Sequence, residues 1–179
     1  MISICLLHML LVRSPLRISL GGGGTDLPSY YRQRGGYLLA ASIDKYVYTS
    51  AIKPFSKGIF LKYSEIEKVQ ETKDIKHKIF KEILSMQEQE NKTYQIELTT
   101  LADVPAGTGL GSSGAFTASV LKALQVYNSK FATNEEIAKE ACHIEIDRLG
   151  EPIGKQDQYA SAIGGFNEFI FHKDDSVEF

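Results

Sequence analysis

The stretch PAGTGLGSSGAF, residues 105–116, places glycines and two serines directly before an apolar run. Glycines let a backbone approach a ligand closely and adopt positive φ. Ser112 and Ser113 stand where a helix would begin, so that free N–H groups and the helix dipole favour an anion there. One serine hydroxyl could also bind a metal ion carried by a phosphate. The stretch predicts a phosphate-binding loop, with a tight turn and an N-capping serine as the simpler alternative.

Two common phosphate loops do not fit this stretch. GLGSSG, residues 109–114, matches G-x-G-x-x-G, but a dinucleotide site needs the loop straight after a strand and an acidic residue about 20 positions later. Here residues 102–106 intervene, and Glu135 and Glu136 fall in the first turn of an expected helix rather than at a strand end. No lysine follows the last glycine, which argues against a Walker A loop.

A second chemical feature is a carboxylate expected on the apolar face of a helix over residues 134–149. At about 100° per residue, Glu145 falls on the face defined by Ile137, Ala138, Ala141, Ile144 and Leu149, and Asp147 falls on the opposite, polar face with Glu136, Glu140 and His143. A buried carboxylate is costly unless a cation or hydrogen bonds compensate. Glu145 is therefore the better candidate for a metal ligand, with a buried salt bridge to Arg148 or Lys155 as the alternative.

A third feature is the glycine run at residues 21–24, which is followed by Asp26 and preceded by Arg17. A carboxylate can accept two hydroxyl groups at once, which makes Asp26 a candidate ligand for sugar hydroxyls. The alternatives are a flexible loop for the glycines and an ordinary turn or N-cap residue for Asp26.

Hydrophobic periodicity indicates the elements that must position these residues. We expect strands over 10–20, 35–52 (one or two), 58–69 and 93–101, and a strand, a turn and the start of another strand towards residue 179. Helices are expected over 74–90, 113–128 and 134–149, with a short helix or turn within 21–31. Thr133 and Glu136 form a capping-box pattern, and Gly150 suits a helix end. Without regular βαβ alternation, the predicted class is α+β.

Composition narrows the functional classes. The chain has 179 residues and a net charge of −2, so one domain is expected and no basic field points to nucleic acid. The first eleven residues are apolar but too short to span a bilayer, so no membrane partner is expected. We favour Met9 as the natural start, which makes 9–179 the domain and 1–8 an extension. Cys5 and Cys142 form no metal-like cluster with the four histidines, and a reduced, cytoplasmic protein is expected.

Residues 105–116 closely resemble the second motif, P-x-x-x-G-L-G-S-S-[AG], of the GHMP kinases. RSPLRISLGGGGTDLP, residues 13–28, resembles the first motif of that family. Gly23 and Gly24 replace the Glu-His pair that galactokinases carry there, which argues against galactose. The four-glycine form and residues 150–165 look like the branch that contains heptose 7-phosphate kinases.

The resemblance implies a fold and a set of site residues. The fold would be the ribosomal-protein-S5-domain-2-like N-terminal domain of these kinases. Asp157 would take the proton of the attacking hydroxyl, and Arg17 would keep Asp157 ionised. The Mg²⁺ ligands would be Ser113 and Glu145. The ATP phosphates would be bound by Pro105, Gly107, Gly109, Leu110, Gly111, Ser112, Ser113 and Gly114, and the sugar by Arg17, Gly23, Gly24, Thr25, Asp26 and Asp157.

The implied activity is transfer of the ATP γ-phosphate to a sugar hydroxyl, with C1 of D-glycero-D-manno-heptose 7-phosphate as the first candidate. Arg32, Arg34 and Lys155 are possible clamps for a phosphate already on the sugar. Alternatives are a fucose-type kinase, a non-catalytic nucleotide-binding remnant and an NAD-binding module. Nothing matches the family's C-terminal domain. We therefore expect a fragment that is inactive or weak alone, with a separate chain as a possible source of the missing domain.

Overall fold

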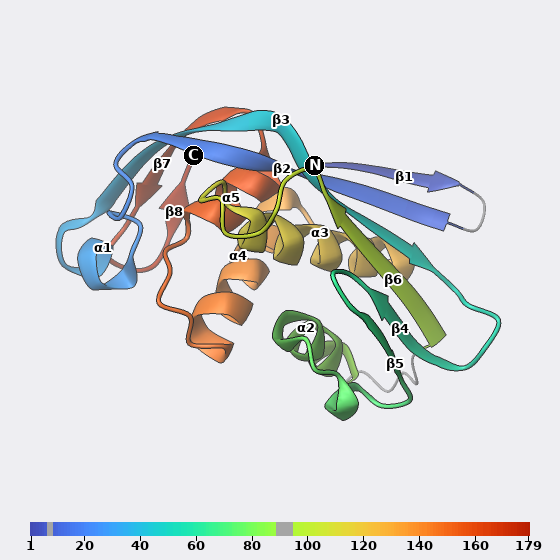
Figure 1. Ribbon diagram of the computed structural model, residues 1–179. Coiled ribbons are helices and arrows are strands. Elements are labelled where there is room, and N and C mark those ends of the chain that lie inside the picture. The colour runs from blue at the N-terminus through green and yellow to red at the C-terminus, as the bar shows by residue number, and fades with distance from the viewer. Residues whose placement is uncertain (7–8, 89–94) are drawn as a thin grey trace.

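The computed structural model describes residues 1–6, 9–88 and 95–179. Within these residues the strands form a single eight-stranded sheet, and the helices lie on one of its faces (Figure 1). The predicted α+β class is confirmed.

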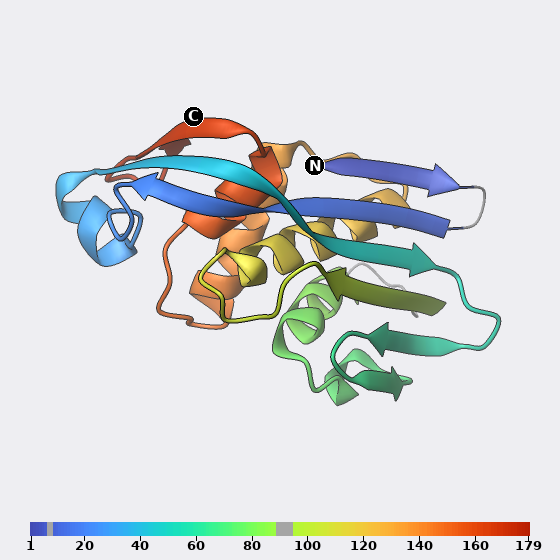
Figure 2. The same cartoon turned by 45° about the horizontal axis from the view of Figure 1, so that its top comes forward.

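Two long strands organise the sheet. β2 (Met9–Gly21) runs antiparallel along one side of β3 (Gly36–Ile52). The other side of β3 is shared, because its first half pairs with β7 (Phe166–Phe171) and its second half with β6 (Gln95–Ala102). Figure 2 shows β3 passing between these neighbours. The long strand therefore connects the part of the sheet near α1 with the part near β4 and β5.

Shorter strands extend both edges. β1 (Ile2–Leu6) pairs with β2, and β8 (Val177–Glu178) pairs with β7. The expected single strand over 58–69 is wrong, because the chain turns at Tyr63–Glu65 to form a hairpin of β4 (Gly58–Lys62) and β5 (Ile66–Val69). The expected strand over 93–101 is present from Gln95; residues 93–94 lie outside the described part. The boundary at residue 9 stays a prediction, and residues 7–8 of the expected extension are likewise not described.

The helices follow the predicted order. They are α1 (Pro28–Arg34), α2 (Lys78–Glu88), α3 (Ser112–Tyr127), α4 (Asn134–Cys142) and α5 (Gln156–Ile163). A 3₁₀ turn, η1 (Thr72–Asp74), precedes α2. The helix expected from residue 74 begins four residues later, after this turn, and residues 89–90 of its expected end are outside the described part. α3 packs across β2 and β3 and contacts both α4 and α5.

The helix predicted over 134–149 changes type within its length. Thr133 and Glu136 form the predicted capping box at the start of α4. After Cys142 the chain continues as a π-helix, η2 (His143–Arg148). π-Helical turns are rare and occur frequently at functional sites. Gly150 follows with a φ of +66°, as expected for the residue after a helix end.

Candidate active site

Arg17 anchors the glycine loop to the sheet. It lies on β2 with only 8% of its surface exposed. Its Nη1 donates to the carbonyl of Gly109 (2.8 Å), and its backbone N–H donates to the carbonyl of Leu110 (3.0 Å). The Leu110 side chain packs beside Leu16 and Val47. The loop is therefore held from the side of β2.

The loop leads directly into α3, whose N-terminus has no side-chain cap. Gly107, Gly109 and Gly111 have φ of +83°, +74° and +78°, which an L side chain rarely adopts. Gly111 is the N-cap residue of α3, and no side chain makes the N-cap hydrogen bond there, whereas Thr133 makes it at α4. The first turn of α3 therefore keeps backbone N–H groups for an anion, as the sequence predicts.

Gly114 allows the N-termini of α3 and α5 to pack closely. A Cβ atom at this position would lie 2.6 Å from the Asp157 Cβ and 2.8 Å from the backbone nitrogen of Gln158. Any side chain here would push α3 away from α5. The glycine therefore brings the phosphate loop and Asp157 into contact, although the motif suggests only a role in binding ATP.

Asp157 and Arg17 form an ion pair, as predicted. Burial raises the pKa of the Asp157 carboxyl, and the Arg17 guanidinium lowers it without reversing the shift. Arg17 acts on this pKa in the predicted direction, because its charge and its hydrogen bond lower it, although burial has the larger effect. A base with a raised pKa accepts a proton more readily.

Ser113 and Glu145 are brought together from α3 and η2. The Ser113 hydroxyl donates to Glu145 Oε2 at 2.8 Å. Glu145 is 1% exposed, its other oxygen has no hydrogen-bond partner among the described residues, and burial raises the pKa of its carboxyl. The alternative of a buried salt bridge is wrong. Arg148 pairs with Glu82 (2.7 Å), and Lys155 pairs with Asp175.

The free oxygen of Glu145 and the Ser113 hydroxyl fit a hard cation such as Mg²⁺. In the described part of the chain, no cluster of three or more His, Cys, Asp or Glu side chains could hold a metal ion. Mg²⁺ is commonly bound by one or two protein ligands together with waters and substrate phosphates. The donor set therefore suits an ion that arrives with a nucleotide.

Ser113 lines two cavities. One, of about 550 Å³, is lined by the loop residues Pro105 to Gly107, by Ser112 and by the rings of Tyr63, His77 and Phe116. The other, of about 500 Å³, is lined by Ser113, Glu145, Asp157, His77 and neighbouring residues. The ring of His77 is 5.0 Å from that of Phe116 and 4.7 Å from that of Tyr63, between centroids. No sequence signal marks this aromatic wall, because it joins three separate elements.

Asp26 is buried rather than open to a ligand. It is 1% exposed, and its carboxylate accepts hydrogen bonds from the backbone nitrogens of Gly24 and Gln156, both at 3.0 Å. Gly23 lies in the adjoining loop, with the Ser19 hydroxyl 3.2 Å from where its Cβ would be. The sugar-binding roles of Gly23, Gly24 and Asp26 stay predictions.

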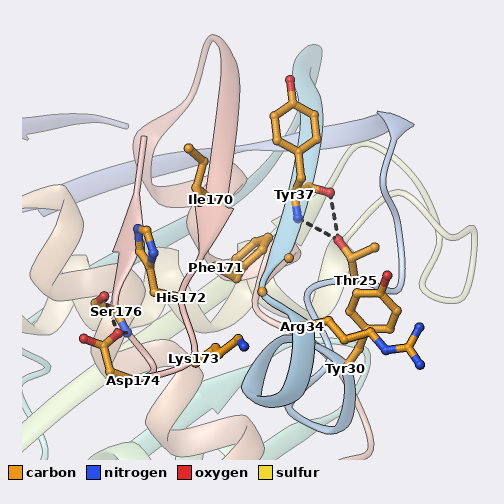
Figure 3. A pocket seen from close by; sticks show the side chains of 12 residues that line it. Thr25, Tyr30, Arg34, Tyr37, Ile170, Phe171, His172, Lys173, Asp174 and Ser176 are labelled. Carbon is orange, nitrogen blue, oxygen red and sulfur yellow. Dashed lines mark hydrogen bonds between the residues drawn. The ribbon is translucent and has the colours of Figure 1, made fainter.

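Thr25 faces a different hollow. Figure 3 shows Thr25 beside Tyr37, whose backbone N–H donates to the Thr25 hydroxyl at 2.9 Å. The hollow has a volume of about 900 Å³, and Arg34 and Lys173 also line it. No ion pair engages Arg34 within the described residues. The two other suggested clamps differ, because Arg32 and Lys155 both contact Asp175.

The Cys142 side chain is buried, and burial raises the pKa of its thiol. Over residues 1–6, 9–88 and 95–179, no helix has the length and apolar character needed to cross a bilayer.

The fold is shared with a solved mevalonate kinase. The crystal structure of the Methanococcus jannaschii mevalonate kinase superposes with a TM-score of 0.72 at 18% identity, covering 96% of this chain and 55% of that one. The chain belongs to the GHMP kinase family, and residues 77–165 match the model of the GHMP kinase N-terminal domain. The resemblance seen in the motifs is thereby confirmed.

Two relatives are similar over nearly the whole chain. The D-glycero-alpha-D-manno-heptose 7-phosphate kinase of Campylobacter jejuni is 36% identical over an alignment of 174 positions, which covers 92% of this chain and 51% of that protein. The crystal structure of a D-glycero-D-manno-heptose 1-phosphate kinase from Bacteroides thetaiotaomicron gives a TM-score of 0.86 at 31% identity, covering 94% of this chain and 58% of that one. The chain thus spans about half the length of the curated relatives it matches.

Proposed function

We propose that this domain is the ATP-binding half of an ATP-dependent sugar kinase. The observation that carries the proposal is the arrangement at the start of α3. The Ser113–Glu145 pair lies beside an uncapped helix N-terminus, and the Arg17–Asp157 pair contacts the same glycine loop. A cation-binding pair and a proton acceptor beside one anion site are the parts that phosphoryl transfer requires.

The two cavities suggest how ATP would lie. The apolar cavity with Tyr63, His77 and Phe116 would take the nucleoside, and the glycine loop and the first turn of α3 would take the phosphates. In this arrangement the loop residues, among them Pro105, Gly107 and Ser112, would bind ATP as predicted. Ser113 and Glu145 would hold Mg²⁺, which when bound neutralises the charge of the phosphates.

Asp157 is suited to accept the proton of the attacking sugar hydroxyl. As that proton passes to the Asp157 carboxylate, the sugar oxygen forms a bond to the γ-phosphorus. The bond from the γ-phosphorus to the bridging oxygen breaks, and its electron pair leaves with ADP. Arg17 would orient Asp157 and hold the loop that carries the phosphates.

The proposed acceptor is the C1 hydroxyl of D-glycero-D-manno-heptose 7-phosphate. The proposal is supported by the name of the Campylobacter jejuni relative, a heptose 7-phosphate kinase. The name of the Bacteroides thetaiotaomicron structure, a heptose 1-phosphate kinase, supports only the broader class of heptose phosphates. The proposal is also supported by the glycines at positions 23 and 24, which leave out the polar pair that galactokinases carry. We keep the predicted cytoplasmic location as part of the proposal.

Binding is the first test. Isothermal titration with ATP and Mg²⁺ should detect a site that Ser113→Ala weakens at least tenfold, while Ser56→Ala, an exposed serine before β4, leaves the affinity unchanged. NADH should not bind. Absence of Mg²⁺-dependent ATP binding by the wild-type chain would refute the proposal.

Turnover is the second test. Phosphorylation of the heptose 7-phosphate, L-fucose and D-galactose should be measured with the chain alone and with the C-terminal half of the Campylobacter jejuni relative added. We expect weak or no turnover by the chain alone and a preference for the heptose when both halves are present. ATP binding without turnover of any sugar in either mixture would instead support a non-catalytic nucleotide-binding domain.

A further inference from the structure

Three rings from separate segments form the aromatic wall of the cavity assigned to the nucleoside. Tyr63 follows β4, His77 precedes α2, and Phe116 lies in α3. The ring of His77 meets that of Tyr63 at an angle of 74° and that of Phe116 at 33°. Phe116 is fixed by its helix, whereas Tyr63 and His77 lie outside the helices and strands. The positions of these two residues therefore depend on contacts from elsewhere.

Glu67 supplies such contacts to both residues. It lies on β5 and is only 7% exposed. Its Oε1 accepts hydrogen bonds from the Tyr63 hydroxyl at 2.7 Å and from the backbone N–H of His77 at 3.1 Å. Its Oε2 accepts the backbone N–H of Lys76 at 2.7 Å. One carboxylate therefore ties the β4–β5 hairpin to the segment that leads into α2.

The Glu67 carboxylate stays ionised in this position. Burial by itself would raise its pKa, but the hydrogen bonds from Lys76, Tyr63 and His77 lower the pKa below the ordinary value of a glutamate. Hydrogen bonds to an ionised acceptor are stronger than those between neutral groups. An amide in place of the carboxylate would turn an NH₂ group towards at least one of the three donors. The three contacts therefore require a carboxylate.

The imidazole of His77 is also held from α2. Its Nδ1 accepts the backbone N–H of Phe80 at 3.4 Å, which orients the ring relative to the first turn of that helix. Burial lowers the pKa of His77, and the charge of Glu67 opposes this shift without reversing it. The ring is therefore neutral near pH 7, which suits a surface on which a base stacks.

Glu67 acts on the cavity only through other residues. Of the described residues, those that line the cavity include Tyr63, Ser64 and His77 but not Glu67. The three donors to Glu67 come from the β4–β5 hairpin and from the segment before α2, and none of them comes from the glycine loop or from α3. An effect of Glu67 on a bound nucleotide must therefore pass through the two rings.

We propose that Glu67 is a positioning residue for the base of the nucleotide, which holds Tyr63 and His77 in the geometry of the aromatic wall and leaves the phosphate site unaffected. The inference rests on the proposed function, in which this cavity takes the nucleoside of ATP. Stacking of a base on an aromatic side chain contributes roughly 5- to 150-fold in affinity. A displacement of the two rings should therefore be visible in nucleotide binding.

The test compares two ligands that share the triphosphate but not the base. NMR titration of the 179-residue chain with Mg²⁺·ATP and with Mg²⁺·tripolyphosphate also detects millimolar binding. We expect Glu67→Gln to weaken ATP binding by roughly tenfold and tripolyphosphate binding by less than about twofold, because the phosphate site shares no partner with Glu67. Glu65→Gln, which replaces an exposed glutamate of the same hairpin, is the matched control and should change neither affinity. Equal losses for both ligands, or no loss for ATP, would overturn the proposal.

The free domain provides a second measurement. The ring centroids of Tyr63 and His77 are 4.7 Å apart, so their ring protons should show a nuclear Overhauser effect in the wild type and in Glu65→Gln. The effect should weaken in Glu67→Gln, and an unchanged effect in that variant would contradict the proposal. This measurement needs no ligand. Absence of ATP binding by the wild type would therefore refute the proposed function as a separate result.

Tyr63→Phe covers the case in which Glu67→Gln does not fold. It keeps the ring and removes only the hydroxyl that donates to Glu67. ATP binding should weaken by about threefold, as expected for one hydrogen bond, with tripolyphosphate binding unchanged; an unchanged ATP affinity would count against the proposal. In the active two-part mixture, Glu67→Gln should raise KM for ATP while kcat and KM for the sugar stay constant. A fall in kcat at constant KM for ATP would overturn the assignment.

Discussion

Replacement of Glu145 by Gln should have opposite effects on the free and the nucleotide-bound domain. In the free domain Glu145 is a buried carboxylate with one unpartnered oxygen, and burial raises its pKa. An unsatisfied buried polar group costs about 1–3 kcal/mol. Glutamine still leaves an amide group unpaired, so we expect a net gain of about 1 kcal/mol for Glu145→Gln, or roughly 2–4 °C in Tm for a chain of this size.

The sign of the pH dependence follows from the direction of the shift. Because the pKa of Glu145 is raised in the folded state, the penalty is absent below the ordinary glutamate pKa of about 4.3 and is complete above the raised value. The advantage of Glu145→Gln should therefore be largest near pH 8 and vanish near pH 4. The matched control is Asp147→Asn, since Asp147 lies on the exposed side of the same π-helix.

Binding of nucleotide should reverse the order of the Tm values of the wild type and of Glu145→Gln. Saturation at about 100 times Kd adds roughly 2.7 kcal/mol to the wild type, or about 5–11 °C in Tm. Glu145→Gln should lose most of this Mg²⁺-dependent increment. Scanning calorimetry at pH 8, with and without Mg²⁺ and ATP, measures both effects. A lower Tm of the free variant, or a full Mg²⁺·ATP shift in the variant, would refute the reasoning.

Four further substitutions test other contacts. Gly114→Ala should lose about 1–3 kcal/mol in denaturant unfolding by overpacking α3 against α5, and a neutral result would contradict the close approach. Arg17→Lys keeps the charge but not the fork that reaches both Gly109 and Asp157, so ATP affinity by titration and kcat should both fall. Thr133→Ala should cost about 1 kcal/mol in the same unfolding assay without changing ATP affinity. Arg34→Ala should raise KM for a phosphorylated sugar only. Equal KM values for the wild type and the variant would contradict a role of Arg34 in binding the phosphate of the sugar.

The residues around the phosphate loop could be predicted because their signals are local. The glycines and serines occupy consecutive positions, and helical periodicity was enough to separate Glu145 from Asp147. That separation holds although the helix becomes π-helical after Cys142. The burial of Ile144 and Glu145 and the exposure of Asp147 follow the apolar face that α4 had already established.

Other parts of the site depend on contacts between distant segments. The hydrogen bond from Gln156 to Asp26 joins the start of α5 to the loop after β2, two segments that the sequence gives no reason to pair. The wall of Tyr63, His77 and Phe116 combines a hairpin, the segment before α2, and α3. The direction in which the pKa of Asp157 shifts depends on whether the effect of burial exceeds the effect of Arg17. The spacing of these residues in the sequence does not reveal this.

The two contacts of Arg17 link the glycine loop thermodynamically to Asp157. One guanidinium holds both the carbonyl of Gly109 and the carboxylate of Asp157. A nucleotide that moves the loop must therefore also move the guanidinium that pairs with Asp157. Linkage of this kind is reciprocal. The change that ATP makes in the proton affinity of Asp157 equals the change that protonation of Asp157 makes in ATP affinity, so either measurement determines the other.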